Sequence, residues 1–84
     1  MDYSQKNILA MVQDLQRAYL GEITMHVQMY RFEDTILVNA CVFDKDDEPH
    51  NFNFPDYESD EQRKENYKKV YDLVYETATA RRTQ

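Results

Sequence analysis

Several residue types that would narrow the fold or the function are scarce in this chain of 84 residues. The single cysteine excludes an internal disulfide, and one glycine with two prolines leaves little sequence for loops. No apolar run approaches the ~20 residues that cross a bilayer. The first twenty residues also lack the pattern of a signal peptide, so we expect a cytoplasmic protein. Catalytic signatures, metal-ligand spacings and glycine-rich phosphate loops are missing, and we expect no cofactor or metal.

Basic residues are few as well. Ten Lys and Arg stand against sixteen Asp and Glu, which gives a formal net charge of −6. This charge repels nucleic-acid phosphates and anionic membranes and favours encounter with basic proteins, so we expect no direct binding to nucleic acid or membrane. A hydrophobic content of 42% is too high for a disordered chain. We expect one compact domain over 1–84, with loose ends at 1–3 and 81–84.

Apolar residues recur at helical spacing near the start of the chain. They are Ile8, Met11, Val12, Leu15 and Tyr19. This spacing predicts a helix from Ser4, as N-cap, to Tyr19 or Leu20. Gly21 suits the end of this helix, because the residue just past a helix commonly adopts a positive φ. Leu9 lies off the main stripe and covers either the margin of the core or an interface.

A second helix is predicted from Asp60 to Ala80. Ser59 and the residues after it form a capping-box pattern with acids in the first turn. The apolar stripe of this helix is Tyr67, Val70, Tyr71, Val74 and Ala78.

Three segments between the helices alternate with the period of strands: Glu22 to Phe32, Thr35 to Phe43, and Pro49 to Phe54. Apolar side chains face each other when Val27 lies opposite Ala40, which favours an even connection, and we expect a four-residue turn centred on Glu33 and Asp34. The same reasoning gives the second hairpin an odd loop from Asp44 to Glu48. The predicted core face of the sheet carries Met25, Val27, Met29, Ile36, Val38, Ala40, Val42, Phe52 and Phe54.

The predicted fold is α+β, in the order α-β-β-β-α, with a three-stranded antiparallel meander and both helices packed on one face. This order resembles that of the double-stranded-RNA-binding domain, whose members present lysines to phosphates at the start of the last helix. Here that turn reads Ser59, Asp60, Glu61 and Gln62. Because acids occupy the entry, phosphate binding is not expected.

The outward face of the sheet is poor in charge and rich in amides and aromatics. Its rows are His26, Cys41 and Asn51, then Gln28, Asn39 and Asn53, with Tyr30, Phe32, Leu37 and Phe43 around them. Such a composition is typical of protein-contact patches, although an open solvated face is the alternative. From this face we predict a partner-binding set of His26, Gln28, Tyr30, Leu37, Asn39, Cys41 and Phe43.

One outer row contains the parts of a cysteine-nucleophile site. Imidazole raises the thiolate content of a cysteine, and an amide orients the imidazole. Parallel side chains on a flat sheet lack an oxyanion hole and a cleft that excludes water, however. We therefore expect no catalysis, and a half-buried Cys41 beside a solvated His26 is the favoured interpretation.

Acidic residues are concentrated between Asp44 and Glu61. Pro49 and Pro55 stand where an EF-hand loop requires glycine and glutamate, which argues against a calcium site. The tract either attracts a basic protein, imitates nucleic-acid phosphates, or is a solvated loop and helix entry. Four of its residues join the predicted partner-binding set: Asp44, Asp46, Asp47 and Glu48.

The expected function is a small acidic intracellular protein-interaction module without catalytic activity. One alternative is an acidic inhibitor, from a phage or mobile element, that mimics nucleic acid. Another is a cysteine-dependent enzyme. The first strand lacks proline, so we also expect its edge to pair antiparallel with a second copy, about a twofold axis near His26, to form a homodimer. The alternatives are that a different protein adds a strand at this edge or that the edge stays in contact with solvent.

Overall fold

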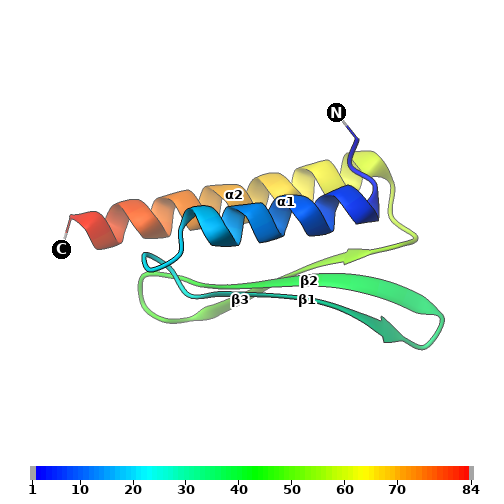
Figure 1. Cartoon of the computed structure of the whole chain (residues 1–84), viewed down its shortest axis with the longest axis horizontal. Coiled ribbons are helices and arrows are strands. Elements are labelled where there is room, and N and C mark those ends of the chain that lie inside the picture. The colour runs from blue at the N-terminus through cyan, green and yellow to red at the C-terminus, as the bar shows by residue number, and fades with distance from the viewer. Residues whose placement is uncertain (1, 84) are drawn as a thin grey trace.

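The computed structural model describes residues 2–83 and has five elements. They are α1 (Gln5–Ala18), β1 (Met25–Phe32), β2 (Thr35–Phe43), β3 (Pro49–Pro55) and α2 (Asp60–Arg82). The strands form one antiparallel sheet in the order β1-β2-β3, and both helices lie on one face of it (Figure 1). The predicted α+β class and the α-β-β-β-α order are confirmed.

Both predicted N-caps are confirmed. The hydroxyl of Ser4 accepts a hydrogen bond from the N–H of Asn7, and that of Ser59 accepts one from the N–H of Gln62. These bonds satisfy backbone donors that the first turn of a helix leaves free. Gly21, which follows α1, has a φ of +90°, as its place in the sequence predicts.

Side chains at both ends of the described chain contact the rest of the fold. α2 continues to Arg82, two residues past its predicted end, because both terminal arginines find carboxylate partners. Arg81 lies 3.0 Å from Asp47, and Arg82 lies 2.6 Å from Glu22. At the other end, the carbonyl oxygen of Tyr3 accepts a hydrogen bond of 2.6 Å from Arg63. The predicted loose residues 1 and 84 lie outside the described part.

The predicted register is confirmed in both hairpins. Val27 pairs with Ala40 in the first, and Ala40 pairs with Phe52 in the second. The expected four-residue turn is wrong, because Phe32 pairs with Thr35 and leaves a two-residue connection. Its first residue, Glu33, has a φ of +56°, which supplies the positive φ that two-residue hairpin turns need.

The core lies between the sheet and the two helices. Its buried residues are Ile8, Val12, Leu15, Met25, Val38, Ala40, Val42, Phe54, Val70, Val74 and Ala78. Two residues predicted for the core are exposed instead, Met29 by 57% and Ile36 by 42%. The β1–β2 hairpin extends past the first turn of α1, so its tip has no helix above it (Figure 1). Tyr71, predicted in the α2 stripe, is also exposed.

Arg63 is the one arginine among residues 2–83 that is buried. Its guanidinium donates to the carbonyl oxygens of Tyr3 and Glu58 and to a carboxylate oxygen of Asp60. Because these acceptors come from the N-terminal segment, the β3–α2 loop and α2, a single side chain fastens three parts of the fold.

Candidate protein-interaction surface

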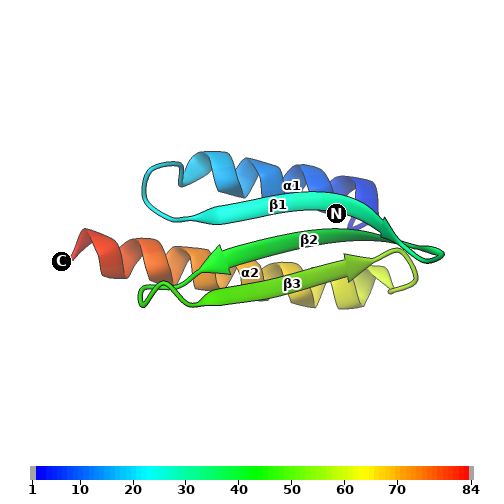
Figure 2. The ribbon, with the colours of Figure 1, turned by 90° about the horizontal axis from the view of Figure 1, so that it is seen from below.

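The outer face of the sheet has neither helix above it (Figure 2). The structure places the predicted rows there, since His26, Cys41 and Asn51 are opposed across the strands, as are Gln28, Asn39 and Asn53. Side chains alternate between the two faces of a strand, so this face also receives Phe32, Thr35 and both prolines of β3. None of its thirteen residues is Asp, Glu, Lys or Arg: His26, Gln28, Tyr30, Phe32, Thr35, Leu37, Asn39, Cys41, Phe43, Pro49, Asn51, Asn53 and Pro55.

An amide cluster lies at the centre of the outer face. The Nδ2 group of Asn39 donates to Oδ1 of Asn53 at 2.9 Å and to Oδ1 of Asn51 at 3.4 Å. Asn39 is only 6% exposed, so these bonds compensate for its burial. Within residues 2–83, no protein atom accepts a hydrogen bond from the Nδ2 groups of Asn51 and Asn53. These donors are free to meet carbonyl groups of a partner.

Apolar side chains lie at both ends of this cluster. At one end, Phe32 is 61% exposed and Tyr30 is 40% exposed. At the other end, the rings of His26 and Phe43 pack edge to face, with centroids 5.9 Å apart and planes at 79°. Exposed aromatic groups on a face without charged residues are typical of protein-contact surfaces.

His26 and Cys41 lie side by side on adjacent strands, but their side chains form no hydrogen bond with each other in the described part. They are directly opposed in the ladder, but the imidazole packs on Phe43, and no hydrogen bond links it to the half-buried thiol in the described part. Among residues 2–83 there is also no group of three His, Cys, Asp or Glu side chains that could hold a metal ion.

In the acidic loop between β2 and β3, two of the predicted site residues, Asp44 and Asp47, form contacts within the fold. Oδ1 of Asp44 accepts from the N–H groups of Asp46, at 2.8 Å, and Glu48, at 3.0 Å. Oδ2 of Asp44 lies 2.7 Å from Nε2 of His50. The hydrogen bond with His50, followed by that from Glu48, lowers the pKa of the Asp44 carboxyl. Asp47 is 80% exposed and pairs with Arg81, so Asp46 and Glu48 are the exposed acids of this loop that form no ion pair within residues 2–83.

The acidic tract is divided in two by β3. Residues 44–48 precede this strand and residues 56–61 follow it. Seven strand residues at ~3.3 Å each place the two groups about 23 Å apart, at opposite ends of the sheet. The second group is also engaged, since Asp56 accepts from the N–H of Ile36 and Asp60 binds Arg63. The tract is therefore not one continuous anionic surface.

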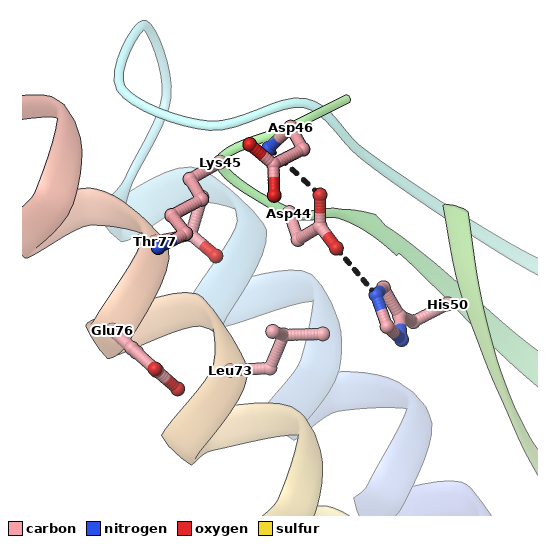
Figure 3. Close-up of a pocket in the computed structure, with 7 residues that line it drawn as sticks. All are labelled: Asp44, Lys45, Asp46, His50, Leu73, Glu76 and Thr77. Atoms are coloured by element: carbon pink, nitrogen blue, oxygen red, sulfur yellow. Dashed lines mark hydrogen bonds and ion pairs between the residues drawn. The ribbon is translucent and has the colours of Figure 1, made fainter. Parts of the chain in front are cut away.

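A small cavity lies between the acidic loop and α2 (Figure 3). Its volume is about 140 Å³, and its lining residues are Asp44, Lys45, Asp46, His50, Leu73, Glu76 and Thr77. Pockets for small ligands typically measure ~300–1,000 Å³, so this one is small for a substrate. The Asp44–His50 pair on its wall links the loop to the start of β3.

The edge of β1 has an alternation that sequence reasoning did not detect. The N–H of Phe43 donates to the carbonyl of Thr24, which makes this opposed pair a hydrogen-bonded one. Because such pairs alternate in an antiparallel ladder, the even residues of β1 direct their N–H and C=O groups to β2 and the odd residues direct theirs outward. Gln16 confirms the direction, since its side chain donates to the outward carbonyl of Met25 at 2.7 Å.

This geometry opposes the antiparallel pairing of two β1 edges. His26, the expected centre, directs its backbone groups to β2. In addition, α1 lies over β1 and projects past its edge (Figure 2). A second β1 would lie ~4.8 Å from the first and bring its own α1 equally close, whereas helix axes need ~8–10 Å.

No helix within residues 2–83 combines the length and the apolar character needed to cross a membrane. Comparison of the chain with models of known protein families, with curated proteins and with solved structures gave no match.

Proposed function

We propose that this protein is a non-catalytic interaction module that binds another protein through the outer face of its sheet. The observation that carries this proposal is the absence of Asp, Glu, Lys and Arg from the thirteen residues of that face, in a chain with 31% charged residues. Depletion of charged residues and enrichment of aromatic residues characterise the centre of protein interfaces.

The partner is expected to carry a basic rim around a polar and apolar centre. The net charge of −6 attracts positive surfaces and increases the rate of encounter, with a dependence on salt. The free amide donors of Asn51 and Asn53 suit carbonyl acceptors, while Tyr30 and Phe32 suit apolar groups. A nucleic-acid mimic has less support, because the acidic residues lie in two separate groups and several bind within the fold.

The test introduces one charge at the centre of the face. Gln28 is exposed, so Gln28→Arg leaves the fold intact while it places a cation where a partner would exclude water. Thr79→Arg, on an exposed position of α2, adds the same charge away from the sheet. Tagged protein captures partners from the native cell extract, and each recombinant partner is then titrated by calorimetry.

We expect Gln28→Arg to weaken binding at least tenfold, about 1.4 kcal/mol, and Thr79→Arg to leave it unchanged. Equal affinity of Gln28→Arg and the native protein would refute the outer face as the binding surface. Failure to recover any partner that binds in purified form would count against the proposal as a whole.

A further inference from the structure

We propose that the edge of β1, with the flank of α1 above it, binds an extended segment of a partner polypeptide as a fourth strand. This mode of binding uses a different surface from the outer face and does not depend on it. The evidence lies in the direction of backbone groups, in the side chains beside them and in the space that α1 leaves.

The distal half of β1 has backbone groups without partners in the sheet. Val27, Met29 and Arg31 are the odd residues of β1 whose N–H and C=O groups point away from β2, as the Thr24–Phe43 pair establishes. An added strand pairs with these groups as strands do in β-augmentation. Met25 is different, because its outward carbonyl already accepts from Gln16. The open part of the edge is therefore its distal half.

The opposite edge of the sheet is blocked. The N–H of Asp44 donates to the carbonyl of Glu48, so the same alternation makes Pro49, Asn51, Asn53 and Pro55 the outward residues of β3. Proline has no N–H to donate, and two of these four positions carry it. The two edges of this sheet thus differ in chemistry, and β1 is the one suited to strand addition.

The side chains beside the open edge favour a partner strand with an apolar residue at every second position. Met29 is 57% exposed on the helix side of β1. Leu9 stands seven residues, about two turns, before Gln16, so both lie on the same side of α1. Because Gln16 reaches the β1 edge, Leu9 borders that edge as well. An incoming strand would place alternate apolar side chains between Met29 and Leu9.

The position of α1 over the β1 edge opposes pairing with a second copy of this molecule but not with a single strand. A copy that pairs through its own β1 brings a second α1 too close to the first, whereas a segment without a covering helix has no such conflict. Glu33 and Asp34 lie exposed at the end of the edge, in a chain of net charge −6. The occupant is therefore an extended, proline-free segment with alternating apolar residues and basic residues beside them.

The experiment uses the full-length protein and a display library of random linear 12-residue peptides. Enriched peptides are synthesised and titrated against the native protein, Met29→Pro and Asn51→Pro. Proline at an outward position of an edge strand removes one free N–H without breaking the ladder. Met29→Pro alters the open edge, and Asn51→Pro is the matched change on the other edge. Circular dichroism checks that both variants fold, and amide exchange of the ¹⁵N-labelled native protein maps the bound peptide.

We expect Met29→Pro to weaken peptide binding at least tenfold and Asn51→Pro to change it less than twofold. Bound peptide should slow the exchange of the Val27, Met29 and Arg31 amides. If Met29→Pro fails to fold, the exchange map decides the question alone. Peptides that protect amides elsewhere, that bind both variants equally, or that are never enriched would each overturn the proposal. Because Gln28→Arg tests the outer face separately, failure here leaves that test intact.

Discussion

At the scale of the single residue, Arg63 links the N-terminal segment to the start of α2. It is 8% exposed, and its guanidinium binds the distant carbonyl of Tyr3 together with two nearby acceptors, the carbonyl of Glu58 and the carboxylate of Asp60. A buried cation is costly unless its donors are satisfied, and here each nitrogen of the guanidinium has an acceptor. The position of the N-terminal segment against α2 depends on this contact.

We predict that Arg63→Ala destabilises the protein by about 2–4 kcal/mol, because it leaves the partly buried carbonyl groups of Tyr3 and Glu58 without these donors. Arg63→Lys should also destabilise it, since one ammonium cannot reproduce the planar fork of donors. Urea denaturation measures both. Arg17→Ala is the control, because the Arg17–Asp14 pair is 72% and 74% exposed and should contribute less than ~0.5 kcal/mol. Equal stability of Arg63→Ala and the native protein would contradict the clamp.

Asp44 makes stability depend on pH. Its folded pKa is lowered, chiefly by His50, so the stabilisation is present above the unfolded pKa and is lost as pH falls through the folded pKa. We predict that the native protein exceeds Asp44→Asn in Tm at pH 7, that this difference begins to shrink as pH falls below ~4, and that it is lost once the pH is below the lowered pKa of the folded state. Thermal scans across pH measure it, with Asp46→Asn as the control. A difference that persists unchanged into acid would show that the carboxylate charge has no role.

At the scale of the element, the two edges of β1 differ in hydrogen bonding, and the pattern of side chains does not show this difference. Alternate residues direct their backbone groups to β2 or to solvent, as the hydrogen bonds at Thr24 and Met25 show. Pro49 and Pro55 occupy outward positions of β3, where a proline costs the sheet no hydrogen bond. The prolines of this chain therefore lie where the ladder does not need their N–H.

We predict that amide exchange in the free protein alternates along β1. The N–H groups of Gln28 and Tyr30 bond to β2 and should exchange slowly, whereas those of Val27 and Met29 face outward and should exchange at least tenfold faster. Exchange measured residue by residue by NMR checks this pattern. Slow exchange at Val27 and Met29 would mean that the edge is already covered, and uniform rates would contradict the assigned direction.

The elements themselves could largely be predicted from the sequence, because caps and periodicity are local signals. The register followed from matching apolar faces, which brought Val27 opposite Ala40, and the same parity fixed which side chains share the outer face. The length of the first turn did not follow, since a non-glycine residue, Glu33, adopts the positive φ. The exposure of Met29 depends on where α1 begins over the sheet, and the burial of Arg63 depends on acceptors that fold around it. Both properties are set by tertiary packing and have no signal in the periodicity of the sequence.

At the scale of the whole molecule, the helical layer is as wide as the sheet. Three strands span ~9.6 Å between the outer two, and two packed helices have axes ~8–10 Å apart. α1 consequently lies over one edge strand, and two copies cannot join their β1 edges into one sheet with both helical layers on the same face (Figure 2).

We predict that the protein sediments as a monomer of 10.1 kDa at ~100 μM, a concentration well above the Kd of a stable specific dimer. Sedimentation equilibrium at physiological salt measures the mass. If the native protein is instead a dimer and Met29→Pro dissociates it, then two copies pair through β1 and the argument from helix packing is wrong.

The prolines of β3 have a consequence for aggregation. Fibrils of the cross-β kind grow because each added chain presents a fresh edge to the next. In this sheet a strand can be accepted at β1, but the far side presents Pro49 and Pro55 at two of its four outward positions. A molecule that joins the end of a growing stack through β1 therefore presents a poor template behind it. The unequal edges make this protein a terminator of strand addition rather than a link in a polymer.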